Sequence, residues 1–295
     1  MQNDVQRTSE GESVKTFIGL TIGIILLFTT SISANADTKV VRISDRSPVE
    51  FGQFIEDVSR SQVTFIGDTH NDSQLHGKQM EIIRALYARD PQLAIGLEMF
   101  TAESQRYLDD WTKGKLEEKD FAAIYAKNWS YDWRLYRDIF IFARDNRIPL
   151  IALNVPKPII SKVVSQGAKT LSESERKELP PAPWTLPPRQ AEYIRRIREQ
   201  AFRNIPARFP VANFDEAQAL RNDSIAYNIT KFREKSPKSK VVVIAGTWHA
   251  IKNGAPESLK KFGSFTFKVV LPDLIEFTWL KPTVEDVDYL IPRGD

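Results

Sequence analysis

The sequence predicts an α/β fold, with a mainly parallel central sheet flanked by helices and a smaller helical insert domain. Two observations lead to this prediction. Short and almost continuously apolar runs alternate with longer segments in which apolar residues recur at helical spacing, as in a parallel sheet covered on both faces. Between residues 156 and 210 this alternation stops, because prolines interrupt the chain at positions 180, 181, 183, 187 and 188.

The first 36 residues have the features of a secretory signal peptide. An apolar run from Phe17 to Phe28 precedes a polar stretch that ends in Ala34-Asn35-Ala36, the small-x-small pattern of a signal peptidase site. A run of about 12 residues is shorter than the roughly 20 needed to cross a bilayer, which favours a cleaved signal over an anchor. Because acidic residues precede the run, we expect translation to begin at Val14 and cleavage to follow Ala36.

Composition narrows the compartment and the partners. The chain has no cysteine, so a disulfide, a thiolate metal ligand and a lipid-modified N-terminal cysteine are all impossible. The net charge is only +3, and no Lys/Arg block interleaved with aromatic residues suits a nucleic-acid groove. We therefore expect a protein exported to a bacterial periplasm, not a lipoprotein, that does not bind nucleic acid and whose mature form does not span a membrane.

Five apolar runs rich in β-branched residues are predicted to be strands, at residues 63–67, 93–98, 149–154, 241–246 and 265–271. Helices are predicted at about residues 74–87, where Asp72 or Ser73 would be the N-cap, and at about 133–146 and 214–234. Residues 37–155 and 214–295 would form the α/β core domain. Residues 156–213 would form the helical insert, as a lid or side domain.

Polar side chains follow these strands at their carboxyl ends. They are Asp68 and His70 after the first strand, Glu98 in the second, Asn154 in the third and His249 after the fourth. Ligands of open α/β sheets bind outside the carboxyl ends of the strands, so we expect these side chains to surround one cavity. His76, at the N-terminal end of the buried face of the first long helix, is expected to join them.

Each of these residues also has an ordinary structural explanation. His70 could be a turn residue, His76 a core histidine, Glu98 a carboxylate held by backbone amides, and Asn154 a residue that shapes a turn. Their coincidence at strand ends favours a shared site. In a chain without cysteine, imidazole and carboxylate are the available metal ligands, and tyrosine or histidine can ligate haem iron. No serine-hydrolase elbow or Walker loop is present in the sequence.

Six segments from about Pro48 to Pro272 carry a family resemblance. In order they are GDTH with a second histidine six residues later, GLEMF, WSYDWRLYRDIFIFAR, IPLIALNVP, FDEAQALRNDSIA and IAGTWHAIKNGAPESL. Together they resemble the ChaN-like haem-binding proteins of the Tiki superfamily. The resemblance implies an exported bacterial protein of haem or iron uptake, a parallel-sheet domain with a smaller helical domain, and haem held at the interface of a homodimer.

The sequence departs from the family pattern at two positions. Asp68 stands where the first motif usually has glutamate, which shortens its reach, and Trp248 stands where members often have glycine, so that it could crowd a flat ligand or stack on it. The haem-ligating tyrosine of the family is not fixed by the motifs. Among Tyr131, Tyr136 and Tyr193 we favour Tyr136.

The sequence therefore predicts a haem-binding protein rather than an enzyme. The predicted cofactor-binding residues are His70, His76, Glu98, Tyr136, Asn154, Trp248 and His249. The alternative implied by the wider superfamily is a metal-dependent hydrolase, either a protease or esterase-like. In that case zinc or manganese would be bound by His70, His249 and Glu98, and Asp68 or Glu98 would serve as general base. A third alternative is an interaction module with a vestigial site.

Overall fold

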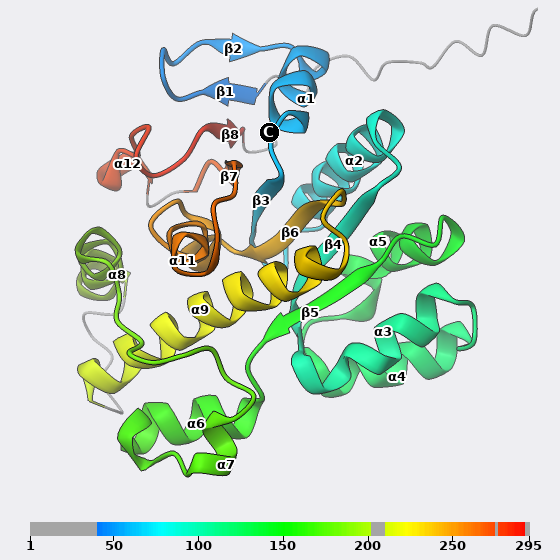
Figure 1. The fold of residues 1–295 in the computed structure, drawn as a ribbon. Coiled ribbons are helices and arrows are strands. Elements are labelled where there is room, and N and C mark those ends of the chain that lie inside the picture. The colour runs from blue at the N-terminus through cyan, green and yellow to red at the C-terminus, as the bar shows by residue number, and fades with distance from the viewer. Residues whose placement is uncertain (1–39, 202–209, 275–276, 293–295) are drawn as a thin grey trace, which may run out of the picture. The chain divides into compact units, whose positions relative to one another are not determined.

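The computed structural model describes residues 40–201, 210–274 and 277–292, so the predicted signal peptide lies outside the described residues. The described residues form an eight-stranded sheet in the order β2-β1-β8-β7-β3-β6-β4-β5 (Figure 1). Neighbouring strands from β8 to β5 are parallel, whereas β1 is antiparallel to both β2 and β8. The strands are β1 (Val40–Arg42), β2 (Pro48–Val49), β3 (Val63–Asp68), β4 (Leu93–Thr101), β5 (Leu150–Asn154), β6 (Lys240–Gly246), β7 (Phe267–Pro272) and β8 (Tyr289–Ile291).

Helices cover both faces of the sheet, so successive residues of the central strands enter different cores (Figure 1). Ile66 packs into the core under the first five helices, and Phe65 packs into the core under α8, α9 and α11. The helices are α1 (Phe51–Ser59), α2 (Ser73–Arg89), η1 (Ala102–Ser104), α3 (Gln105–Thr112), α4 (Glu118–Asn128), α5 (Trp133–Asp145), α6 (Lys157–Gln166), η2 (Ala168–Thr170), α7 (Glu173–Arg176), α8 (Pro188–Ala201), α9 (Val211–Lys235), α10 (Thr247–Ala250), α11 (Ala255–Phe262) and α12 (Phe277–Leu280).

The predicted fold class is confirmed, and the five predicted strands correspond to β3 to β7. Each is buried on both faces, which explains why it reads as a continuous apolar run. The strands β1, β2 and β8 were not predicted, because two or three residues carry no measurable alternation. They extend the sheet beyond β7, where β8 is parallel to β7 and β1 is antiparallel to β8 and β2.

The segment predicted as a helical insert contains α6, α7 and α8, and it packs in two directions. Val163, Leu171 and Trp184 share a small core with Leu220 of α9. In contrast, Ile194 of α8 joins the core on the sheet itself. Helix α9 begins at Val211, earlier than the predicted residue 214, so its first three residues belong to the segment predicted as the insert. In the part of the chain that the structure describes, no helix is both long and apolar enough to cross a membrane.

Candidate functional site

A cavity of about 1010 Å³ opens at the carboxyl ends of β3, β4 and β6. We call it the carboxyl-end cavity, and its lining includes Asp68, His70, Glu98, Arg221, Trp248 and His249. Strand pairing explains the convergence, since the register of β3 and β6 sets Asp68 directly opposite Gly246. The volume is at the upper end of the range of small-molecule sites, roughly 300–1,000 Å³.

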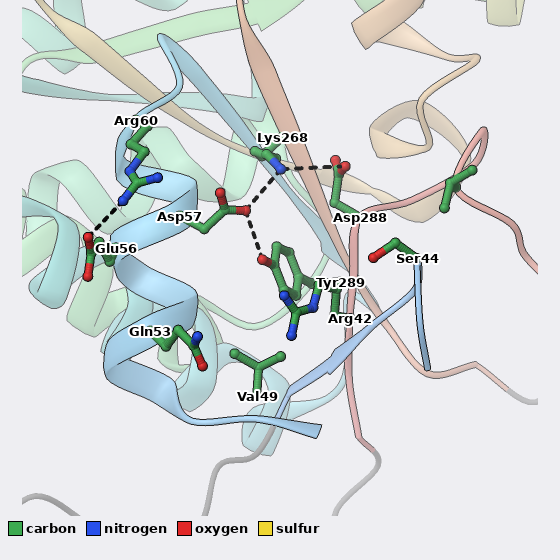
Figure 2. Close-up of a pocket in the computed structure, with 11 residues that line it drawn as sticks. Arg42, Ser44, Val49, Gln53, Glu56, Asp57, Arg60, Lys268, Asp288 and Tyr289 are labelled. Carbon is green, nitrogen blue, oxygen red and sulfur yellow. Dashed lines mark hydrogen bonds and ion pairs between the residues drawn. The ribbon is translucent and has the colours of Figure 1, made fainter. Parts of the chain in front are cut away.

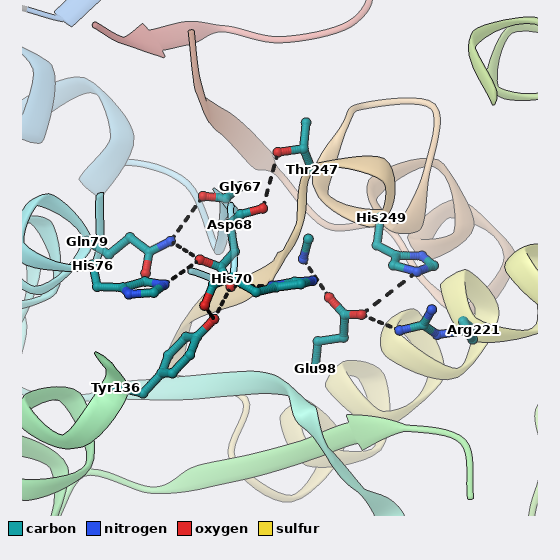
Figure 3. Close-up of polar contacts among 11 residues, drawn as sticks. Gly67, Asp68, His70, His76, Gln79, Glu98, Tyr136, Arg221, Thr247 and His249 are labelled. Atoms are coloured by element: carbon teal, nitrogen blue, oxygen red, sulfur yellow. Dashed lines mark hydrogen bonds and ion pairs between the residues drawn. The ribbon is translucent and has the colours of Figure 1, made fainter. Parts of the chain in front are cut away.

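Asp68 is the centre of a buried hydrogen-bond cluster at the end of β3 (Figure 3). Its carboxylate accepts hydrogen bonds from Tyr136 Oη at 2.6 Å, His70 Nδ1 at 2.7 Å, His76 Nε2 at 2.9 Å and Gln79 Nε2 at 3.1 Å. Burial by itself would raise the pKa of Asp68, but the hydrogen bonds from the two histidines outweigh burial and hold the pKa well below its usual range. Asp68 is therefore an ionised acceptor.

His70 lies between the Asp68 cluster and Glu98 (Figure 3). Its ring contacts Trp129 edge-on, with centroids 4.9 Å apart, and Tyr131 at 5.0 Å. A Cβ atom added to Gly246 would lie 3.3 Å from His70 Nε2 and 3.4 Å from Glu98 Oε2, so glycine leaves room for both groups. Burial lowers the pKa of His70, but the Asp68 hydrogen bond and the charge of Glu98 outweigh burial and raise it.

Glu98 is a fully enclosed carboxylate with two fixed partners. Its Oε2 accepts from the Gly246 backbone N–H at 2.5 Å, and its Oε1 forms an ion pair with Arg221 of α9. Burial raises the pKa of Glu98, but the charge of Arg221, followed by smaller contributions that include His70 and the Gly246 N–H, outweighs burial and lowers it, so the side chain is ionised. Asn154 supports this arrangement from behind, because its Nδ2 donates to the Glu98 backbone carbonyl at 2.9 Å.

His249 approaches Glu98 from the short helix α10, directly after β6. Its Nε2 lies 3.9 Å from Glu98 Oε1, and its Nδ1 lies 2.6 Å from Asn222 Oδ1. Burial, followed by the nearby charge of Arg221, lowers the pKa of His249 to about 3. The imidazole is therefore neutral at physiological pH.

The predicted site residues divide into two groups. His70, Glu98, Trp248 and His249 line the carboxyl-end cavity, as does Asp68. His76, Tyr136 and Asn154 do not line it but hold the lining groups from behind. Of the three tyrosines considered as haem ligands, Tyr131 lies in the lining and Tyr136 lies behind Asp68.

Sequence reasoning missed three polar residues of the site. Gln79 donates to Asp68, Arg221 pairs with Glu98, and Asn222 contacts His249. Arg221 and Asn222 are adjacent polar residues on α9, next to Leu220, which is fully buried. Polar residues beside a buried position of a helix are the sequence signal that could have indicated them. Their side chains diverge toward different partners, which a helical pattern alone does not specify.

The metal alternative gains no support from this geometry. Across residues 40–201, 210–274 and 277–292, no group of three or more His, Asp or Glu side chains could hold a metal ion. Arg221 already supplies the positive charge beside Glu98, and His249 Nε2 stands 3.9 Å away. The predicted zinc or manganese site at His70, His249 and Glu98 is therefore not supported.

A second cavity, of about 460 Å³, lies between α1 and the strands β1, β7 and β8 (Figure 2). We call it the α1–β8 cavity, and its lining includes Arg42, Asp57, Lys268, Asp288 and Tyr289. Its charged groups pair with one another, since Asp57 Oδ2 accepts from Tyr289 Oη at 2.8 Å and pairs with Lys268 Nζ at 2.9 Å. None of the predicted site residues lines it, so it is not the candidate site.

Comparison with solved structures gives one informative similarity. Among solved structures, the fold is similar to ChaN of Campylobacter jejuni, whose structure is described as cofacial heme binding, with a TM-score of 0.69 and 18% identity over 88% of this chain and 98% of that chain. A mutant of the erythromycin esterase EreC gives a TM-score of only 0.47 at 11% identity, over 79% of this chain and 76% of that one, which supports no inference.

Among curated proteins, 138 residues are 30% identical to Protein RETICULATA-RELATED 5, chloroplastic, of Arabidopsis thaliana. The match covers 43% of this chain but only 18% of that relative's length. A family model described as haem-binding uptake, Tiki superfamily, ChaN matches residues 54–259, well over half of the chain, and so confirms the resemblance found in the sequence. The chain belongs to the haem-binding uptake family ChaN of the Tiki superfamily.

Proposed function

We propose that this chain is an exported haem-binding protein that takes part in haem or iron uptake. The observation that carries the proposal is the carboxyl-end cavity, which combines a volume of about 1010 Å³ with aromatic rings and an imidazole held on a buried carboxylate. Membership of a haem-binding family supports the same assignment. Haem would supply an iron atom that accepts electron pairs and a flat apolar ring.

The cavity suits the shape of a porphyrin. Trp129 and Tyr131 lie 5.7 Å apart between ring centroids, and Phe214 and Trp248 contribute to the same lining. Aromatic side chains of this kind bury the large apolar face of a flat ligand. Trp248, which departs from the family pattern, therefore belongs to the surface that would meet the porphyrin.

Three groups in the lining can ligate iron, the Tyr131 phenol and the imidazoles of His70 and His249. Tyr136, favoured from the sequence, fits less well, because its hydroxyl donates to Asp68. Burial and the Asp68 charge raise the pKa of Tyr136, so its phenolate form is strongly disfavoured. His70 is better prepared, because a carboxylate on Nδ1 orients the ring and increases the basicity of Nε2.

The acidic groups of haem would be met by Lys78. Its ammonium group lines the cavity near Pro292, whose carbonyl lies 3.2 Å away. Arg134 and Arg137 do not line the cavity and pair with Asp132 and Glu118 instead. A cation in the lining suits the negative charge of a propionate.

The test is a titration of the purified protein with haemin, followed by absorbance. We expect a Soret band that is weakened in His70→Ala and Tyr131→Phe. Tyr107→Phe is the matched control, because Tyr107 lies on α3 and does not line the cavity. Absence of any spectral shift at micromolar haemin would remove the proposal.

Export and dimerisation are separate parts of the proposal. The small-x-small pattern supports cleavage after Ala36, and N-terminal sequencing of protein from a periplasmic fraction should then begin at Asp37. The family resemblance supports a homodimer, which light scattering with and without haemin would detect. Protein that keeps its first 36 residues would contradict export by this signal.

A further inference from the structure

A chain of buried amide groups connects α8 to His249. Gln190 Nε2 donates to the backbone carbonyl of Trp248 at 2.8 Å, and Asn222 Nδ2 donates to Gln190 Oε1 at 2.8 Å. Asn222 Oδ1 then faces His249 Nδ1 at 2.6 Å. Gln190, Asn222 and His249 are 0%, 1% and 4% exposed as whole residues, so water does not compete for these bonds.

The donors and acceptors in this chain have only one consistent assignment. A backbone carbonyl can only accept, so Gln190 must present its NH₂ group to Trp248 and its oxygen to Asn222. Asn222 must then present its NH₂ group to Gln190, which leaves its oxygen toward His249. An amide oxygen can only accept, so His249 must carry a proton on Nδ1.

The start of α8 is fixed independently of the amide chain. Arg189, the neighbour of Gln190, donates to both carboxylate oxygens of Asp286 at 2.7 Å and to Glu285 at 2.8 Å. The backbone at Gly254 packs closely against the Gln190 side chain, since a Cβ atom added to Gly254 would lie 3.0 Å from Gln190 Nε2. The amide of Gln190 therefore has little freedom to turn over.

We propose that Gln190 and Asn222 are positioning residues that hold His249 as the tautomer with its proton on Nδ1, so that a bare Nε2 electron pair faces Glu98 and the carboxyl-end cavity. Glu98 Oε1, 3.9 Å away, is also an acceptor, so the two groups cannot bond to each other. This end of the cavity is therefore built for a ligand atom that accepts an electron pair or donates a proton. Its relevance to haem rests on the proposed function, whereas the tautomer itself does not.

Nuclear magnetic resonance of isotope-labelled histidine tests the assignment without any haem. The chain has only three histidines, so the His249 signals are identified by their loss in His249→Gln. We expect the neutral Nδ1–H form for His249 in the wild-type protein. A wild-type His249 that carries its proton on Nε2, or on both nitrogens, would overturn the proposal.

Two variants test the residues that impose the tautomer. Asn222→Leu removes the acceptor at Nδ1, so the proton should move to Nε2 and bond to Glu98. Gln190→Leu should give a mixture of tautomers, because the Asn222 amide can then rotate by half a turn. In Gln190→Glu, a protonated carboxyl group can still donate to the Trp248 carbonyl and accept from Asn222, so this variant should preserve the wild-type tautomer. An unchanged tautomer in both leucine variants would overturn the proposal, and unshifted His76 signals would show that the fold persists.

Haemin affinity is the second readout. Changing an outer partner of a ligating histidine typically lowers metal affinity roughly 10- to 100-fold, and we expect a loss of this size in Asn222→Leu. Asn228→Leu is the matched control on the same helix, since Asn228 donates to the Leu153 carbonyl and not to His249. If wild-type protein ignores haemin yet shows the Nδ1–H form, the proposed function fails and the tautomer assignment stands.

Discussion

The carboxyl-end cavity and the α1–β8 cavity both contain ionised carboxylates, but these carboxylates have different partners (Figures 2 and 3). In the α1–β8 cavity, Asp57 pairs with Lys268 and accepts from Tyr289. In the carboxyl-end cavity, Asp68 is held largely by imidazoles, and Glu98 by a guanidinium and a backbone amide. In the α1–β8 cavity the carboxylate is therefore paired with an opposite charge, whereas in the carboxyl-end cavity the carboxylates also position histidine side chains that line the cavity.

Burial explains why this difference matters. The side chains of Asp68 and Glu98 are 1% and 3% exposed, whereas that of Asp57 is 35% exposed. A buried charge that loses its partner destabilises the fold by several kcal/mol, whereas an exposed pair is worth about 0–1 kcal/mol. Equivalent substitutions in the two cavities should therefore have unequal costs, and that inequality can be measured.

The largest effect is expected from Arg221→Met. The substitution leaves Glu98 charged and buried with only the backbone amide and nearby histidines, so the free energy of unfolding should fall by about 3 kcal/mol. Urea denaturation followed by circular dichroism measures it. Lys268→Met in the α1–β8 cavity is the control and should cost less than about 1 kcal/mol. Equal losses would remove the distinction between the cavities.

Asp68→Asn should have the next largest effect. An amide oxygen cannot accept the four hydrogen bonds that the carboxylate accepts, and the new NH₂ group would face other donors. We expect a loss of about 2 kcal/mol in the free energy of unfolding and a weakened Soret band with haemin. Asp57→Asn, measured in parallel, should lose less than half as much and leave the Soret band unchanged.

The dependence of the free energy of unfolding on pH below about 5 should also differ between Asp68 and Asp57. The folded-state pKa of Asp68 is depressed, so its ionisation stabilises the fold above the unfolded pKa of about 3.9, and this contribution is lost as pH falls through the folded pKa. The difference in unfolding free energy between wild type and Asp68→Asn should therefore be smaller at a pH of about 3 than at about 5, where His70 is already protonated beside Asp68. Asp57 has the same sign, with a smaller change because solvent screens it. A difference that grows as the pH falls from about 5 to about 3 would contradict the assignment.

The smallest effects concern two glycines. A Cβ atom at Gly246 would lie 3.1 Å from His70 Cε1, so Gly246→Ala should displace the imidazole and lower stability by about 1 kcal/mol. Gly52 on α1 has nothing within 4 Å of its added Cβ atom, so Gly52→Ala should stabilise the helix by roughly 0.5 kcal/mol. Thermal unfolding resolves the opposite signs, and a stabilising Gly246→Ala would show that His70 is not confined.

Much of the fold followed from local pattern. Strands β3 to β7 are largely buried, so each contains a run of apolar residues that is recognisable without its neighbours. Helix α2 was recognisable from apolar residues at helical spacing after the candidate N-caps Asp72 and Ser73, and in the structure Asp72 is the cap that accepts from the Leu75 N–H. The short strands β1 and β8 were missed, because each exists only through pairing with a distant segment.

The sequence by itself determined that polar residues stand at the carboxyl ends of parallel strands. Alternating apolar runs and helices predict that the strands are parallel, so their carboxyl ends lie at the same edge of the sheet. Only the tertiary structure decided that Arg221 pairs with Glu98, 123 residues earlier in the chain, and that Tyr131 rather than Tyr136 lines the cavity. The physical reason is that each buried strand and its following helix produce a local apolar pattern, and this pattern fixes which residues stand at the strand ends. The direction of a side chain depends instead on which distant helix, such as α8 or α9, packs beside it.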